Sequence, residues 1–208
     1  MRKVIVVFAN SVKHGRHCVA GKEIHTMQWI RPVGNAEDAE LDHNRCICVN
    51  PYGRFPVKPL QKVEIDLTTH SPLINQPENY LVGNGGWSQQ YRIETSEVAH
   101  YLDTPDTLWG TGNRVIFSEI ASGAISIRQS LYLVKVSDLR IYKNVDDKRR
   151  APFSYNGNSY DLPVTDPNFE SQMRNPQHQS VLCVSLGEKF DPTGGTNYSC
   201  YKIVAAII

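Results

Sequence analysis

The chain has 208 residues and a net charge of only +1, with 40% hydrophobic and 21% charged residues. These totals are typical of a globular protein with one large or two small domains, and they exclude a highly basic, histone-like nucleic-acid binder. No apolar run approaches the roughly 20 residues that a membrane helix needs, and no cleavage site follows the short apolar run after Met1. We therefore expect a cytoplasmic protein without a membrane partner.

The first β elements are predicted from apolar runs. Residues 3–9 are predicted to form a strand whose residues 4–9 are all apolar, and residues 18–21 and 28–33 resemble two further strands. Residues 63–68 alternate between apolar and polar side chains, which predicts a strand with one buried face. Residues 51–60 contain three prolines and a glycine, so we expect a loop there.

The middle of the chain, residues 71–130, has a different composition, with six acidic and three basic residues. Thr95 provides an N-cap signal for one short helix, because apolar residues follow it at helical spacing up to Leu102. Trp87 and Trp109 need burial, so we interpret this segment as a packed connector rather than a flexible linker.

The last third again has the pattern of short strands. Asn156-Gly157 is a strong hairpin signal, and a basic turn at 143–150 precedes it. A short helix is predicted from Asp166 to about Arg174, because Pro167 follows a capping residue. Residues 181–186 and 201–208 are the last predicted strands.

About five short strands therefore occur within each end of the chain. This count predicts a mainly β protein with a few short helices, in which two small barrels are joined by a partly helical connector. The predicted boundaries are 1–70 for the first barrel, 71–130 for the connector and 131–208 for the second barrel.

Five cysteines are spread along the chain, an odd number that favours reduced thiols. Cys46 and Cys48 have C-x-C spacing, and no second ligand pair follows at zinc-finger spacing. We therefore expect small buried thiols, with no metal site and no cofactor.

Residues 1–31 carry six Lys or Arg and one Glu, a local charge of +5. A Trp and three His lie in the same stretch. A cationic surface on a β scaffold is what an anionic ligand requires. The residues do not by themselves identify this ligand.

Motifs in almost every part of the chain are specific when taken together: Asn10-Ser11-x-Lys13, Arg16-x-Cys18-Val19-Ala20-Gly21, Trp29-Ile30-Arg31-Pro32-Val33, Gln76-Pro77-Glu78-Asn79-Tyr80, Trp87, Leu108-Trp109, Asn113-Arg114-Val115, Thr165-Asp166-Pro167, Leu182-Cys183-Val184-Ser185-Leu186-Gly187 and Tyr201-Lys202-Ile203-Val204-Ala205-Ala206-Ile207-Ile208. In this order they resemble a bacterial family of dual OB-fold (DuOB) proteins. The resemblance implies two OB-type barrels and a nucleic-acid-binding or sensing role in prokaryotic conflict systems. It implies no catalytic residues.

OB barrels bind single strands by combining a cationic groove with aromatic stacking. The candidates for ligand contact in the first barrel are Ser11, Lys13, Arg16, Lys22, Trp29 and Arg31. Trp29 is equally compatible with a core position. Arg31 shares a strand face with Trp29, so burial of Trp29 would leave Arg31 paired inside or at the rim.

Four further candidates lie outside the first barrel. Asn79 follows a polar loop and is a candidate for contact with a base edge, although turn chemistry explains the loop equally. Lys148 and Arg149 are candidates for phosphate contact in a turn that is otherwise simply solvated. Lys202 lies between aromatic and aliphatic strand residues, where it either snorkels or reaches a cleft.

These observations favour non-enzymatic binding of single-stranded nucleic acid or of a nucleotide-like anionic ligand. One alternative is a hydrolase or transferase acting on nucleic acid or a modified nucleotide, with Cys18, Ser11 or Asp166 in its site. For Asp166 the competing interpretation is an N-cap. Another alternative is an adaptor that binds a partner protein through the acidic connector, with Glu94 and Glu97 at the interface.

Overall fold

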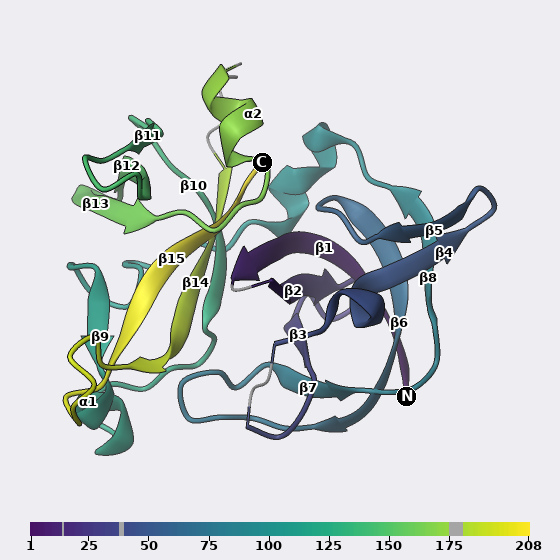
Figure 1. The fold of residues 1–208 in the computed structure, drawn as a ribbon, viewed down its shortest axis with the longest axis horizontal. Coiled ribbons are helices and arrows are strands. Elements are labelled where there is room, and N and C mark those ends of the chain that lie inside the picture. Colours follow the sequence, from purple (N-terminus) through teal and green to yellow (C-terminus); the bar gives the residue numbers. More distant parts are fainter. Residues whose placement is uncertain (14, 38–39, 175–180) are drawn as a thin grey trace. The chain divides into compact units, whose positions relative to one another are not determined.

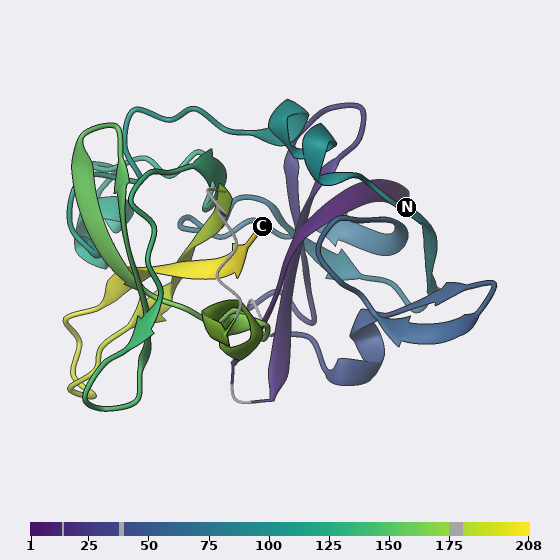
Figure 2. The same cartoon turned by 90° about the horizontal axis from the view of Figure 1, so that it is seen from above.

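The chain folds into two units, each built around its own β-sheets (Figures 1 and 2). The computed structural model describes residues 1–13, 15–37, 40–174 and 181–208, except for the side chain of Lys13. Unit 1 comprises Met1–Leu73 and Glu78–Tyr101, and unit 2 comprises Ile74–Pro77 and Leu102–Ile208.

Five strands of unit 1 close into a barrel: β1 (Arg2–Lys13), β2 (Arg16–Glu23), β3 (Trp29–Val33), β6 (Gln61–His70) and β7 (Asn79–Val82). Their order around the barrel is β1-β2-β3-β7-β6, and β6 pairs back to β1. The β3–β7 pairing is parallel, whereas the other four are antiparallel. This closed five-stranded barrel confirms the first predicted OB-type unit.

The hydrophobic pattern explains how these strands are buried. Val63, Ile65 and Leu67 on β6 are fully buried, and the residues between them are half-buried, as the alternation predicts. On β1, Val7 belongs to the barrel core, and the ring of its neighbour Phe8 packs against aromatic rings. Both faces of β1 are therefore covered, which explains why its central run is wholly apolar.

Other elements extend the barrel sheet: β4 (Ile47–Asn50), β5 (Gly53–Pro56), β8 (Trp87–Arg92) and the 3₁₀ helices η1 (His43–Cys46) and η2 (Thr95–Tyr101). The prediction that residues 51–60 are entirely loop is wrong, because β5 pairs with β4 as a hairpin. Gly53 has a φ of 137°, which allows the chain to reverse there. Pro56 is accommodated because it ends an edge strand of the sheet.

Unit 2 contains a four-stranded sheet in the order β10-β14-β15-β9 and a three-stranded sheet in the order β11-β12-β13. The strands are β9 (Arg114–Ile116), β10 (Leu131–Lys135), β11 (Tyr142–Lys143), β12 (Arg149–Tyr155), β13 (Asn158–Pro163), β14 (Val181–Phe190) and β15 (Ser199–Ile207). Two short α-helices accompany them, α1 (Phe117–Ala121) and α2 (Phe169–Arg174).

Two isolated bridges connect these sheets. Ser137 pairs with Ser154 in the antiparallel sense, and Val164 pairs with Val204 in the parallel sense. The strands β10, β12, β13, β15 and β14 consequently follow one another in the same neighbour order as β1, β2, β3, β7 and β6. Unit 2 is thus a more open version of the unit 1 barrel, as the prediction of two OB-like barrels requires.

Local signals in both units match the structure. Asn156 and Gly157 both have positive φ, 46° and 76°, which is the geometry of a type I′ turn between β12 and β13. The α2 helix begins at Phe169, three residues after the predicted cap Asp166. Helix η2 occupies the predicted helical segment near residue 95, in 3₁₀ form.

The division into units differs from the predicted three-part division, because residues 71–130 form no unit of their own. Strand β7 closes the unit 1 barrel, and Trp87 packs in the core of that barrel. Leu108 instead belongs to the core of unit 2. Across the described residues, none of the helices is both long and apolar enough to cross a membrane.

Candidate functional site

The predicted stacking residue Trp29 lies inside unit 1. It is 5% exposed, and its ring packs edge-on against Phe8, with 6.0 Å between the ring centroids. Lys22 is 3% exposed, and its Nζ donates a hydrogen bond to the carbonyl oxygen of Tyr101 at 2.8 Å. The same Nζ lies 5.2 Å from the centroid of Trp29. Both side chains therefore stabilise the barrel, and Trp29 takes the core position that its sequence also allowed.

Arg31 is paired inside unit 1, as its shared strand face with a buried Trp29 requires. Its Nη2 lies 3.4 Å from Oε1 of Glu78, and both side chains are buried. Asn79 is fully buried, and Ser11 is nearly so. In this structure none of these three candidates presents its side chain to solvent.

Other cations near the N-terminus have carboxylate partners at the surface. Arg16 lies 3.1 Å from Oδ1 of Asp42, and Arg2 lies 3.0 Å from Oε1 of Glu64. The backbone of Lys13 pairs with Arg16, but its side chain lies outside the described part of the chain. Four of the six cations in residues 1–31 are consequently buried or paired and add nothing to an open cationic face: Arg2, Arg16, Lys22 and Arg31.

The basic candidates at the start of β12 differ from each other. Lys148 is exposed, whereas Arg149 is half-buried and lies 3.5 Å from Oε1 of Glu170. Arg149 also donates to the carbonyl oxygen of Asp166 at 3.3 Å, and its guanidinium lies over the Phe169 ring. Arg149 therefore holds the start of α2, and only Lys148 of the two is open to solvent.

Lys202 is fully buried in unit 2. Its Nζ donates to the carbonyl oxygens of Gly110 at 2.7 Å and Gly112 at 2.6 Å. Burial lowers the pKa of this amine to about 8. The side chain neither snorkels to the surface nor reaches an open cleft, and its role is to anchor residues 110–112 to β15.

The residues considered for catalysis have structural contacts. Asp166 is buried, and its carboxylate accepts hydrogen bonds from the backbone N–H groups of Asn168 at 2.7 Å and Ile207 at 2.9 Å. Among the cysteines that were not catalytic candidates, burial raises the pKa of the Cys46 thiol to about 12. Cys18 is half-buried. The described residues contain no cluster of His, Cys, Asp or Glu that could hold a metal ion.

Unit 2 carries a surface that the sequence candidates did not include. We call it the aromatic-basic surface, and it spans both faces of the paired strands β14, β15 and β9: Phe117, Lys189 and Tyr198 on one face, and Arg114, Phe190 and Tyr201 on the other. Nζ of Lys189 lies 5.5 Å from the ring centroids of both Phe117 and Tyr198. Lys189 is exposed, so this cation beside two rings is accessible to a ligand.

A second cation and ring pair lies on the opposite face of the same strands, because Arg114 pairs with Tyr201 whereas Lys189 pairs with Cys200, the neighbour of Tyr201 on β15. Arg114 donates a hydrogen bond from Nη1 to the Tyr201 hydroxyl at 3.3 Å, and its guanidinium carbon lies 5.9 Å from the Tyr201 ring centroid. Phe190 packs edge-on against Tyr201 and remains 56% exposed. Cations and aromatic rings thus occur together on both faces of the paired strands β14, β15 and β9.

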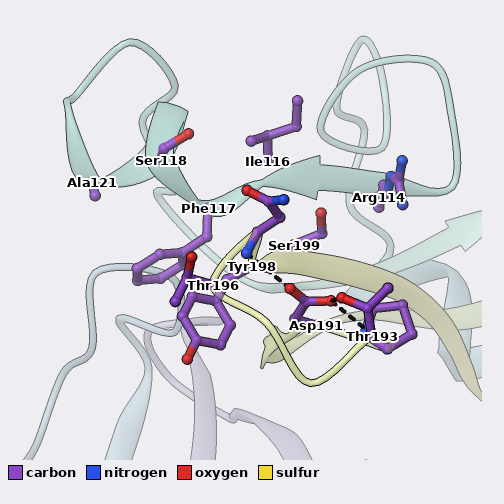
Figure 3. A pocket seen from close by; sticks show the side chains of 12 residues that line it. Arg114, Ile116, Phe117, Ser118, Ala121, Asp191, Thr193, Thr196, Tyr198 and Ser199 are labelled. Atoms are coloured by element: carbon purple, nitrogen blue, oxygen red, sulfur yellow. Dashed lines mark hydrogen bonds between the residues drawn. The ribbon is translucent and has the colours of Figure 1, made fainter.

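A partly open hollow of about 610 Å³ lies within this surface (Figure 3). Phe117 stands at one side of the hollow and Arg114 at the other (Figure 3). Its lining residues are Arg114, Ile116, Phe117, Ser118, Ala121, Asp191, Pro192, Thr193, Thr196, Asn197, Tyr198 and Ser199. This volume lies within the range of small-ligand sites, about 300–1,000 Å³.

The loop between β14 and β15 is held in shape by the carboxylate of Asp191. Its oxygens accept hydrogen bonds from N and Oγ1 of Thr193, at 2.8 and 2.7 Å, and from N of Asn197 at 2.8 Å. These hydrogen bonds lower the pKa of Asp191, the one from the Thr193 hydroxyl most strongly. The carboxylate in the hollow is therefore bonded to its own loop, which orders the rim that carries Tyr198.

The place of this loop in the barrel also matters. Of the five strands that correspond to the unit 1 barrel, β14 and β15 are the fourth and fifth in chain order. OB barrels contact oligonucleotides with the loop between their fourth and fifth strands. Lys and Arg neutralise phosphates, and exposed rings stack on bases. Together these groups form the combination that single-stranded nucleic acid requires.

Sequence reasoning missed this surface because its parts are distant in the chain. Pairing of β9 with β15 places Ile116 opposite Ser199, which brings residues 114–117 beside residues 189–201. The predicted strand at 181–186 also ended too early, since β14 continues to Phe190. The one available signal was the pair Lys189-Phe190, where a cation and an aromatic ring follow an apolar strand.

A family model described as the dual OB-containing domain matches residues 3–207. The match covers nearly the whole chain, so the chain belongs to the dual OB-containing domain family. The search of curated proteins found no match.

Proposed function

We propose that the chain, as a member of the dual OB-containing domain family, binds single-stranded nucleic acid without catalysis, through the aromatic-basic surface of unit 2. The family supports a role of the nucleic-acid- or oligonucleotide-binding type. The observation that carries the finer proposal is the position of Lys189 Nζ, 5.5 Å from the rings of both Phe117 and Tyr198.

The physical argument rests on two contributions. An aromatic platform contributes about 1–3 kcal/mol per stacked base. Lys189 and Arg114 add salt-sensitive contacts with the phosphates of the nucleic-acid strand, because each neutralised phosphate releases condensed counterions. Lys148, the exposed cation near β12, is a further candidate for phosphate contact on unit 2.

Two parts of the proposal concern the ligand and the biological setting. A nucleotide-like anionic ligand would occupy the hollow and contact one aromatic ring and one arginine. A nucleic-acid strand would contact the whole aromatic-basic surface.

A sensor or accessory role in prokaryotic defence would use the same surface to detect exposed single strands. The family resemblance supports this role.

Fluorescence-anisotropy titrations test the proposal. The labelled probes are a 12-nucleotide dT strand, a 12-nucleotide U strand and a 12-base-pair DNA duplex, each at two salt concentrations. We expect salt-sensitive binding of a single strand, and Tyr198→Ala and Phe117→Ala should each weaken it about five- to 100-fold, the effect of losing a stacked base.

Tyr52→Ala is the matched control, because Tyr52 is a highly exposed ring on unit 1, outside this surface. It should leave the affinity unchanged. Equal affinities of Tyr198→Ala, Tyr52→Ala and the unmodified protein would contradict the site assignment. Absence of binding to all three probes at micromolar protein would contradict the function itself and favour a small ligand or a partner protein.

A further inference from the structure

Unit 1 contains a second hollow, of about 220 Å³, on a different part of the chain from the aromatic-basic surface. Its lining residues are Asn44, Arg45, Ile47, Arg54, Val82, Gly83, Asn84, Gly85, Gly86 and Trp87. They come from η1, from the β4–β5 hairpin and from the connection between β7 and β8. We call it the Arg45–Arg54 hollow.

The glycine connection on one side of this hollow is fixed by Asp66 on β6. The backbone N–H of Gly85 donates to Asp66 Oδ2 at 2.8 Å, and that of Gly83 donates to the Asp66 carbonyl oxygen at 2.9 Å. A Cβ on Gly83 would lie 2.1 Å from Asp66 Oδ2, and one on Gly85 would lie 2.7 Å from it. A side chain at either position would displace the Asp66 carboxylate, so glycine at both positions preserves the contact between this carboxylate and the connection.

The lining is cationic. It contains two arginines and two asparagine amides, and no carboxylate is among its described residues. Arg54 is exposed, and Arg45 is half-buried with one long hydrogen bond, 3.4 Å from Nη1 to the Gly34 carbonyl oxygen. The guanidinium groups therefore retain donors for a ligand, because each carries five N–H bonds.

The Asp66 carboxylate lies against the glycine side of this lining and already accepts a hydrogen bond from the glycine connection. Arg2 lies opposite Asp66 in the β1–β6 pairing and donates to the carbonyl oxygen of Gly86 at 3.3 Å. The Asp66 carboxylate and the Arg2 guanidinium therefore both hold the backbone of the glycine connection.

The size of the hollow restricts the ligand. Sites for drug-sized molecules occupy about 300–1,000 Å³, so about 220 Å³ suits a smaller group. Arginine forks match the oxygens of phosphate with paired hydrogen bonds. We propose that the Arg45–Arg54 hollow binds a phosphate group, as the free ion or as the terminal phosphate of a nucleotide.

This proposal does not depend on the aromatic-basic surface, because no residue is shared between the two sites. The test is a titration of the ¹⁵N-labelled protein with inorganic phosphate at constant ionic strength, followed by ¹H–¹⁵N correlation spectra. We expect saturable shifts of the Gly83, Asn84, Gly85 and Gly86 amides, and no such shifts with chloride.

The double variant Arg45→Gln with Arg54→Gln should weaken phosphate binding at least tenfold. Arg92→Gln removes the same charge from an exposed position on β8 outside the hollow, and it should leave the affinity unchanged. The dispersion of each spectrum reports whether the variant is folded. Unsaturable shifts, or equal affinities in the double variant and the control, would overturn the proposal.

Two further titrations distinguish the sources of phosphate. Adenosine 5′-monophosphate and adenosine are compared at the same concentrations. Binding of the monophosphate at least tenfold more tightly than inorganic phosphate, with no saturable shifts from adenosine, assigns the site to nucleotide phosphates. Equal affinities assign it to the free ion. Saturable shifts of the same amides with adenosine alone would overturn a phosphate-specific site.

Discussion

Arg31 and Glu78 form a buried ion pair across the parallel β3–β7 pairing of unit 1. Arg31 Nη2 lies 3.4 Å from Glu78 Oε1, and the two side chains are 6% and 5% exposed. The backbone N–H of Arg31 also donates to the Glu78 carbonyl oxygen at 3.0 Å. Both contacts fasten the closure of the barrel, so this arginine serves stability at a place where the sequence suggested phosphate binding.

The first prediction concerns this pair. Removing one partner leaves an uncompensated charge in the interior, which typically costs about 3–5 kcal/mol. Arg31→Met and Glu78→Gln should therefore each lower the free energy of unfolding by about this amount, measured by urea denaturation. Arg16→Ala breaks an exposed pair with Asp42 and should cost about 0–1 kcal/mol. Similar small losses in all three variants would contradict a structural role for Arg31.

The second prediction concerns the salt dependence of strand binding. Lys189→Gln and Arg114→Gln should each lower the magnitude of the slope of log K against log salt by about 0.7, because each removes one phosphate contact with a single strand. Lys58→Gln, at an exposed position on unit 1, should leave the slope unchanged. Anisotropy titrations between 50 and 300 mM salt, at roughly five concentrations, provide the slopes. A slope that is identical in all three variants would show that Lys189 and Arg114 do not contact the phosphates of the nucleic-acid strand.

Much of the fold could be predicted because its signals are local. The alternation on β6 and the Asn156-Gly157 turn depend only on neighbours in the chain, and both occur as expected. The edge strand β5 was missed because its prolines indicate a loop. Pro56 pairs with Ile47 on β4, and no strand of the sheet follows β5 on its other side, which is a property of the tertiary structure.

The candidate site was less predictable because charge counts do not reveal distant partners. Arg2 and Arg31 were counted toward a cationic face, yet their carboxylates, Glu64 and Glu78, lie about 50–60 positions away in the chain. Burial of Trp29 likewise depends on Phe8 packing from another strand. Only the assembled barrel shows which cations remain available to a ligand.

The third prediction is a pH dependence at His17. The Asn10 Nδ2 group donates to the Val57 carbonyl oxygen at 2.7 Å, so Asn10 Oδ1 accepts from His17 Nδ1 at 2.8 Å. His17 Nε2 then accepts from His43 Nδ1 at 3.2 Å. Burial, and secondly the charge of His43, lower the pKa of His17 in the folded protein.

A lowered pKa means that the unfolded chain binds this proton more readily than the folded one. The free energy of unfolding should therefore fall as the pH falls below about 6.5, the ordinary histidine value. Urea midpoints measured from pH 7.5 to 5.5 check this, with His17→Gln as the variant that cannot gain the proton. Its midpoint should fall less steeply with acidification. Parallel curves for the two proteins would exclude His17 as the source.

The fourth prediction concerns Gly21 on β2, where the barrel strands approach closely. A Cβ at this position would lie 2.4 Å from the Val6 carbonyl oxygen and 2.9 Å from Cδ1 of Ile5. The oxygen belongs to the backbone of β1, which is paired with β2 on one side and β6 on the other and cannot easily move. Gly21→Ala should therefore cost at least the 1–3 kcal/mol typical of overpacking.

Gly86→Ala provides the contrast for this fourth prediction, because a Cβ there meets nothing within 4 Å and its φ is not positive. At such a site alanine restricts the unfolded chain and stabilises the fold by about 0.4–1 kcal/mol. Urea denaturation of the two variants should thus move the midpoint in opposite directions. The strand pairing continues around the whole barrel, so β1 and β2 cannot separate without a cost in free energy. An unchanged midpoint for Gly21→Ala would therefore contradict the close approach of β1 and β2 at Gly21.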